Sequence, residues 1–313
     1  MFLRRFIAIG IILITTVVMV PLAPLVVLLS WVITKVTKWK SLDRAVLFAY
    51  GYLYYEIMGV SKLVWVGVRY RNDYELMIAK SYDVQRWWAQ ALFNLATALF
   101  KLRFTVSGED AITGDGFILV SRHTNVADNF FPLVFVGTPR QKPIRYILKK
   151  ELRAVTTLDI GGHRLPNYFI DRTGLQTERE LEKVRELLVT CDNDDSLLIY
   201  PEGTRFSREK QERLRAREEM KEQVERWPDL LPPRLGGITA LLDANPGKDV
   251  VFLCHNGFEG SGGFGDLIDG VWLNTDVNLQ FWRVPYADIG QDYQAFIFDQ
   301  WDRMQSTLAE MRS

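Results

Sequence analysis

Apolar residues are concentrated at the N-terminal end of the chain. Residues 6–33 run without a charged side chain, roughly 42 Å if helical and more than a bilayer core needs. Pro21 and Pro24 interrupt this run, and two prolines so close together break or kink a helix. Each piece is then too short to cross a bilayer alone, and basic residues flank both ends. The pattern favours a re-entrant helical hairpin in one leaflet over one kinked spanning helix.

Two more helical segments are expected before residue 103. Residues 45–68 are apolar and rich in Tyr and Trp, which favour the headgroup depth of a membrane. Residues 83–102 carry an apolar stripe at helical spacing, which either packs on a protein core or lies on a membrane surface. The stripe consists of Trp88, Leu92, Leu95 and Leu99. We therefore predict that residues 1–102 form a membrane anchor with interfacial helices.

From residue 103 onward, short apolar runs alternate with helical patterns. The predicted strands are 103–106, 117–120, 144–148, 168–170, 197–200, 249–254 and 277–284. The predicted helices are 178–191, 208–226, 238–242 and 293–311, and the glycine-rich stretch 257–270 is predicted to be a loop. This alternation predicts an α/β fold over residues 103–313, a mixed sheet flanked by helices and preceded by the membrane-embedded helices.

Composition narrows the classes of function. Lys plus Arg and Asp plus Glu number 38 each, so the chain lacks the basic excess of a nucleic-acid binder. Cys191 and Cys254 lie in apolar segments and are predicted to be buried free thiols. The histidines lack the clustered spacing of a metal site, and the sequence has no Gly-x-Ser-x-Gly nucleophile turn. We therefore expect no metal and no nucleic-acid partner.

His123 and Asp128 form the first candidate site. The apolar strand 117–120 ends just before His123, and Thr124 or Asn125 can cap a following helix. Asp128 then lies about one turn into that helix, where its carboxylate can reach one ring nitrogen of the imidazole. The other nitrogen is left as an oriented base for taking a proton from an alcohol. In isolation, the pair is also compatible with a packed histidine and a solvated aspartate at a helix start.

Two further strands end in charged turns. Arg172 follows the predicted strand 168–170, and a fixed guanidinium can hold two phosphate oxygens at once. The second turn, Pro-Glu-Gly-Thr-Arg at 201–205, combines a proline that stops strand pairing with a glycine that lets a ligand approach the backbone. Glu202 and Arg205 could hold a hydroxyl and a phosphate. A surface salt bridge and a generic charged turn are the alternatives for these two blocks.

In this order, the three blocks resemble those of the glycerophospholipid acyltransferase superfamily, the lysophosphatidic acid acyltransferases and their relatives. That family carries His-x4-Asp, a Phe-Ile-Asp-Arg-like block and Pro-Glu-Gly-Thr-Arg behind membrane helices, and the resemblance covers roughly residues 100–290. It implies that His123 is the general base and that Asp128 orients it. The substrate-binding residues that it implies are Arg172, Glu202, Gly203, Thr204 and Arg205.

The resemblance also implies an activity. The expected reaction moves a fatty acyl group from acyl-CoA or acyl carrier protein to the free hydroxyl of lysophosphatidic acid, giving phosphatidic acid. No cofactor is expected beyond the acyl donor, and the expected partners are the lipid bilayer, the lysophospholipid acceptor and that donor. The expected location is a membrane, with the catalytic part on the cytoplasmic face of a bacterial inner membrane or an equivalent internal membrane. Two alternatives stay open: acylation of another lysophospholipid or lyso-aminolipid, and a non-catalytic lipid-binding membrane protein.

Two positions depart from the family pattern. Arg122 stands where the family often has Asn, and its guanidinium could contact the lipid head or CoA. The fourth block of the family usually has a proline after an apolar strand, but here the strand continues into residues 254–257. Within that block, His255 is expected to be a capped core histidine, with a pocket-lining role as the alternative. His163 lies where the family often has basic residues lining the site.

Overall fold

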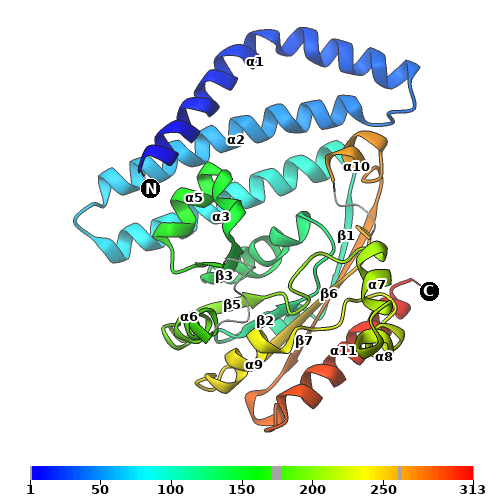
Figure 1. Ribbon diagram of the computed structural model, residues 1–313. Helices are drawn as coiled ribbons and strands as arrows, with labels where there is room; N and C mark the ends of the chain where they lie inside the picture. The colour runs from blue at the N-terminus through cyan, green and yellow to red at the C-terminus, as the bar shows by residue number, and fades with distance from the viewer. Residues whose placement is uncertain (1, 171–177, 260–262, 313) are drawn as a thin grey trace. The chain divides into compact units, whose positions relative to one another are not determined.

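The computed structural model describes residues 2–170, 178–259 and 263–312 of the 313-residue chain (Figure 1). The chain divides into two compact units. The first unit comprises Met1–Arg103, Lys149–Asn167 and Gly263–Thr275, and the second comprises Phe104–Leu148, Tyr168–Gly262 and Asp276–Ser313. Besides the predicted anchor, 1–102, the first unit therefore contains two segments from the predicted catalytic part.

Helices build the first unit. They are α1 (Phe2–Val36), α2 (Leu42–Arg69), α3 (Tyr74–Phe100), α5 (Thr156–Arg164) and α10 (Phe264–Asp269), with a 3₁₀ turn at Lys150–Ala154. The helix α10 lies inside the stretch 257–270, so the prediction of a loop is wrong over those residues. Its start is stabilised because the Asp266 carboxylate accepts the backbone N–H of Gly263 at 2.8 Å.

The helix α1 continues through both prolines, so of the two expected effects, a break or a kink, the break is wrong. Pro21 and Pro24 have no amide hydrogen to donate to the preceding turn, and the helix bends instead of ending (Figure 1). Among the residues that the structure describes, Arg4–Val36 is the one helix long and apolar enough to cross a membrane. Its most apolar window is entirely unburied, which leaves its side chains available to lipid.

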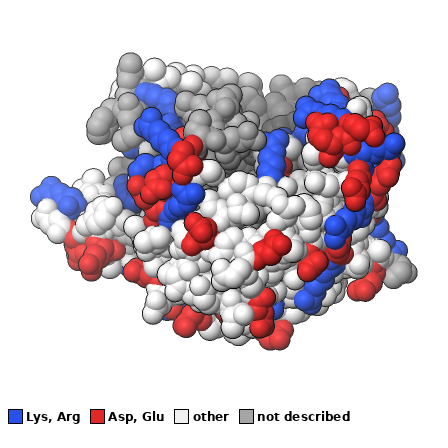
Figure 2. All heavy atoms as spheres, turned by 60° about the horizontal axis from the view of Figure 1, so that its bottom comes forward, with Lys and Arg blue, Asp and Glu red and all other residues white. Residues whose placement is uncertain are grey.

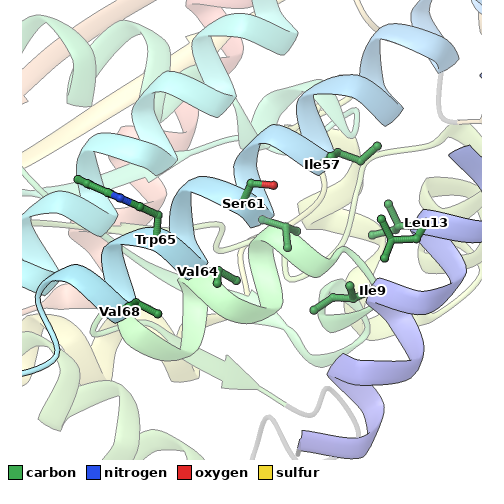
Figure 3. A pocket seen from close by; sticks show the side chains of 9 residues that line it. Ile9, Leu13, Ile57, Ser61, Val64, Trp65 and Val68 are labelled. Carbon is green, nitrogen blue, oxygen red and sulfur yellow. The ribbon is translucent and has the colours of Figure 1, made fainter.

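A groove between α1 and α2 is lined almost entirely by apolar side chains (Figure 3). Its volume is about 560 Å³, and its lining includes Ile9 and Leu13 from α1 with Val64 and Trp65 from α2. Ser61 contributes a hydroxyl, and none of the described residues that line the groove has a titratable side chain. The proton chemistry predicted from the sequence therefore lies elsewhere.

The second unit is organised on a seven-stranded sheet of order β1-β7-β6-β2-β5-β3-β4. The strands are β1 (Arg103–Ser107), β2 (Ile118–Ser121), β3 (Ile144–Lys149), β4 (Tyr168–Ile170), β5 (Ser196–Ile199), β6 (Val250–His255) and β7 (Asp276–Val284). β2 pairs in parallel with both β5 and β6, and β5 pairs in parallel with β3. β7 runs antiparallel to β6. The predicted mixed α/β sheet is confirmed.

Helices and short turns connect these strands. The helices are α4 (Thr138–Arg140), α6 (Glu178–Val189), α7 (Arg208–Arg215), α8 (Glu218–Arg226), α9 (Leu235–Asp243) and α11 (Tyr293–Glu310). Shorter turns are Glu109–Ile112, Ala127–Asn129, Tyr286–Asp288 and the π-helical Pro132–Gly137. The predicted helix 208–226 is split because Arg217 takes an extended conformation. Acidic and basic side chains are interspersed on the face shown in Figure 2.

The main core of the second unit packs α6, α9 and α11 against one face of the sheet. Side chains alternate along a strand, so Val120, Ile199 and Phe252 all point into this core. They pack in one cluster with Leu188 of α6 and Trp301 of α11, both fully buried. Each such side chain stabilises the fold by about 1.5–3 kcal/mol. This packing fixes the strands and, with them, the turns that follow their C-terminal ends.

Candidate active site

The register of the three central strands brings three polar side chains to one edge of the sheet. The residues side by side on β2, β5 and β6 are Val120, Ile199 and Phe252. His123, Glu202 and His255 each follow this row by three residues. Because the strands are parallel, their C-terminal ends meet at the same edge, where open α/β sheets place their ligands.

His123 and Asp128 lie within hydrogen-bond distance of each other. The Nδ1 atom of His123 is 3.1 Å from Oδ2 of Asp128, and that oxygen also accepts the backbone N–H of Asn125 at 2.7 Å. The side-chain oxygen of Asn125 in turn accepts the N–H of Ala127 at 3.0 Å. The chain then forms a 3₁₀ turn, Ala127–Asn129, and not the predicted start of an α-helix. With the Nδ1 proton facing the carboxylate, Nε2 keeps its lone pair for a substrate.

The charge of Asp128 is maintained in spite of complete burial. Burial by itself raises the pKa of this carboxyl, but His255, the hydrogen bond from His123 and the N–H of Asn125 together bring the pKa below its usual value. The carboxylate is therefore ionised at neutral pH. An anion in this position orients the imidazole and stabilises its protonated form.

Tyr200 holds the imidazole from one side. Its ring stacks on that of His123, with the centroids 4.5 Å apart and the planes at 25°. Its hydroxyl donates to the backbone carbonyl of Asp128 at 3.0 Å. Burial raises the pKa of Tyr200 well above its usual value, so the hydroxyl remains a donor. Sequence reasoning missed this residue, although its place at the end of β5, directly before Pro201, was a usable signal.

Glu202 faces the backbone of the candidate base. One carboxylate oxygen accepts the N–H of His123 at 2.8 Å, and the other accepts the N–H of Leu231 at 3.4 Å. The residue is 1% exposed, and burial raises its pKa to about 7 although Arg122 and these two N–H groups oppose the shift. The backbone carbonyl of His123 also accepts the N–H of Phe206 at 2.6 Å. The turn after β5 therefore holds His123 by both of its peptide groups.

In the rest of the Pro-Glu-Gly-Thr-Arg turn, Pro201 is buried and residues 203–205 are half-buried. Gly203 has a φ of +66° and donates its N–H to the carbonyl of Tyr200 at 3.0 Å. Lys210 ties the turn to the start of α7, since its ammonium donates to the Thr204 hydroxyl at 2.9 Å and to the Arg205 carbonyl at 2.6 Å. The other predicted phosphate ligand, Arg172, lies outside the described residues.

Arg122 turns inward, and its side chain is completely buried. Its guanidinium donates to the carbonyl of His255 at 2.5 Å, to the carboxylate of Glu259 at 2.7 Å and to the carbonyl of Asp229 at 3.1 Å. The expectation that Arg122 contacts a lipid head or CoA is therefore wrong. Its guanidinium connects three chain segments behind the candidate base.

The two other histidines are held by their own surroundings. His255 is fully buried, with Nε2 3.4 Å from the carbonyl of Arg122 and 3.7 Å from the Asp128 carboxylate. Burial lowers its pKa, against the attraction of Asp128. The complete burial confirms the predicted core histidine. In the first unit, His163 lies 3.2 Å from the carboxylate of Asp159, which also pairs with the two arginines near the start of α1.

The described residues contain no group of three or more His, Cys, Asp or Glu side chains that could hold a metal ion. Both cysteines are free thiols. Cys254 is buried, as predicted, and Cys191 is half-buried.

Comparison with known proteins places all three sequence blocks in one matched segment. Residues 103–247 match the family model Acyltransferase. No curated protein sequence matches the chain. Among solved structures, the chain is similar to the 1-acyl-sn-glycerophosphate (LPA) acyltransferase PlsC from Thermotoga maritima, with a TM-score of 0.57 and 18% identity. This match covers 86% of the present chain and 98% of PlsC, and at such identity it shows a shared fold.

Proposed function

We propose, since this chain belongs through its residues 103–247 to the glycerophospholipid acyltransferase superfamily, that it transfers a fatty acyl group to the free hydroxyl of lysophosphatidic acid. The proposed donor is the thioester of acyl-CoA or acyl carrier protein, and the proposed product is phosphatidic acid. The observation that carries this proposal is the 3.1 Å contact between His123 Nδ1 and Asp128 Oδ2. It leaves the other ring nitrogen as a proton acceptor in a turn at the edge of the sheet.

In the proposed reaction, Nε2 of His123 takes the proton of the acceptor hydroxyl as the oxygen attacks the thioester carbonyl carbon. The carbon–sulfur bond then breaks, and the imidazolium returns the proton to the departing sulfur. Asp128 stabilises the transient cation, and the stacked ring of Tyr200 keeps the imidazole in place. A thioester is reactive enough that positioning and one base suffice.

Acceptor binding is assigned to the turn beside the base. We propose that Arg205 and Arg172 hold the phosphate of the lysolipid and that Gly203 and Thr204 contact its glycerol part. Glu202 was expected to contact the head group as well. Since both of its oxygens accept backbone N–H groups, we propose instead that it positions His123.

The proposed location follows from the substrates. The lysolipid and the acyl chain of the donor both reside at a bilayer, and the unburied apolar helix Arg4–Val36 is suited to holding the enzyme there. Basic residues at both ends of this helix support a cytoplasmic face for the catalytic part. A bacterial inner membrane or an equivalent internal membrane is the proposed setting.

The direct test is release of free CoA thiol by purified protein given acyl-CoA and lysophosphatidate in detergent micelles. His123→Ala should lower turnover by at least about 1,000-fold because the base is removed. The matched control is Val126→Ala, an exposed residue of the same turn, which should retain wild-type turnover. Undiminished thiol release by a folded His123→Ala protein would remove the proposed base.

A panel of acceptors, run with acyl-CoA and with acyl carrier protein, decides the substrate. Lysophosphatidate should be preferred over lysophosphatidylethanolamine and a lyso-ornithine lipid. Preference for one of the latter would favour the alternative acceptor class. Binding of lysolipid without turnover on any member of the panel would favour a non-catalytic lipid-binding protein.

A further inference from the structure

The loop between α8 and α9 brings another arginine to the Pro-Glu-Gly-Thr-Arg turn. The backbone N–H of Arg234 donates to the carbonyl of Pro201 at 2.8 Å, and that of Leu231 donates to Glu202. Pro232 and Pro233 lie between these two attachments, and both are buried. Because each proline ring fixes φ, the loop has little freedom between its two attachments. Arg234 is thus held in a set position relative to the turn.

The side chain of Arg234 lies across Gly203. A Cβ atom added to Gly203 would be 2.9 Å from Cδ of Arg234, 3.2 Å from Nε and 3.4 Å from Cζ. Any larger residue at 203 would therefore push the guanidinium away. Position 203 requires glycine for two reasons. Its φ of +66° is unfavourable for residues with a Cβ atom, and the arginine side chain occupies the space that a Cβ would take.

The guanidinium of Arg234 is exposed, and in the described part of the chain it has no hydrogen bond or ion pair. The adjacent carboxylate, Glu202, does not neutralise it, because both of its oxygens accept backbone N–H groups. Arg122 and Arg208, by contrast, are paired with Glu259 and Asp229. This guanidinium presents five N–H donors beside Gly203, the residue that follows Glu202, and such a group suits an oxyanion.

We propose that Arg234 is a substrate-binding residue that holds a phosphate monoester, in addition to the arginines of the sequence blocks. The inference rests on the proposed acyl transfer, in which both reactants can carry this group. Lysophosphatidic acid carries a phosphate monoester on its glycerol, and coenzyme A carries one on its ribose. The planar fork of the guanidinium binds two oxygens of either.

Equilibrium binding separates the two sources. Radiolabelled lysophosphatidate in micelles and CoA are titrated against the full-length wild type, Arg234→Gln and the control Arg215→Gln. Arg215 is likewise exposed, on α7. Monoacylglycerol and pantetheine serve as the matching ligands without the phosphate. Arg234→Gln should weaken binding of one phosphate ligand by about tenfold or more and leave its phosphate-free partner unchanged. Arg234→Lys, which keeps the charge and loses the fork, should fall in between.

The proposal is overturned if Arg234→Gln binds both phosphate ligands as tightly as Arg215→Gln does. A purely structural role for Arg234 would lower the melting temperature and would weaken binding of the phosphate-free ligands equally. Failure of the proposed function gives a different result, namely a wild type that binds these ligands but transfers no acyl group. The binding comparison decides the role of Arg234 in either case.

Discussion

The guanidinium of Arg122 and the carboxylate of Glu259 are 2.7 Å apart, and the arginine side chain is completely buried. Arg122 directly precedes the candidate base, and Glu259 lies in the turn after β6. A second oxygen of Glu259 accepts the N–H of Gly257 at 2.8 Å. The pair therefore joins the C-terminal ends of β2 and β6 directly behind His123.

Removing the charge of Glu259 should destabilise the protein strongly. Glu259→Gln leaves a buried guanidinium with neutral acceptors, and breaking a buried pair on one side costs about 3 kcal/mol. A fall of several degrees in melting temperature is expected, together with lower turnover because the backbone at His123 loses support. The control Glu209→Gln breaks an exposed pair with Arg213 and should change the melting temperature by little. Equal effects of the two substitutions would contradict the role given to Arg122.

Asp128→Asn should lower turnover by about 100- to 10,000-fold with little change in lysophosphatidate binding. An amide at this position can donate to Nδ1 of His123, which moves the ring proton to Nε2 and removes the acceptor. The kinetic constant kcat and the equilibrium binding of lysophosphatidate are to be measured side by side. A variant that keeps its kcat would show that the carboxylate does not orient the base.

Glu202 should make stability depend on pH. Burial raises its pKa from 4.5 to about 7, so between these values the unfolded chain loses the proton while the folded protein keeps it. The contribution of this group to the free energy of unfolding is therefore fully present below about pH 4.5 and is lost as the pH rises to about 7. Above that pH it no longer changes. The total loss is roughly 3 kcal/mol. Glu202→Gln does not titrate. Relative to the wild type, its melting temperature should therefore rise between pH 5 and pH 8, and a constant difference would contradict the raised pKa.

Gly203→Ala should reproduce the loss of Arg234. The new methyl group collides with the arginine side chain and strains a backbone at φ +66°, the strain costing about 1–2 kcal/mol. The matched control is Gly290→Ala, because Gly290 has a φ of +71° with nothing near its added Cβ. Both variants should melt at lower temperature, but Gly203→Ala alone should weaken phosphate-dependent binding. Added to Arg234→Gln, it should cause little further loss of the phosphate-dependent part of the affinity, and full additivity in that part would show that the two residues act separately.

The sequence predicted the strands that carry the candidate site because their apolar runs are short and fully buried. The structure places β2, β5 and β6 within a residue or two of the expected bounds. The strong patterns around them, His-x4-Asp and Pro-Glu-Gly-Thr-Arg, are local in the chain. Local spacing was enough to expect that His123 and Asp128 would meet.

The misses have physical causes. Pro21 and Pro24 were expected to break or kink α1, and the break does not occur. A helix of 35 residues has enough other backbone hydrogen bonds to continue past two missing donors with a bend. The partner of Arg122 could not be foreseen because Glu259 is 137 positions away, and the two meet through the pairing of β2 with β6. Arg234 was missed for the same reason, since its contact with Gly203 depends on how a distant loop folds back.

The shared offset of His123, Glu202 and His255 from one row of the sheet limits how this protein can change in length. A residue inserted between Val120 and His123 would shift His123 out of this shared offset and away from Glu202. A deletion between Ile199 and Glu202 would move the Glu202 carboxylate away from the backbone N–H of His123 that it accepts. Engineered loops are therefore better grafted into the connections at the amino-terminal edge of the sheet, which do not set this offset.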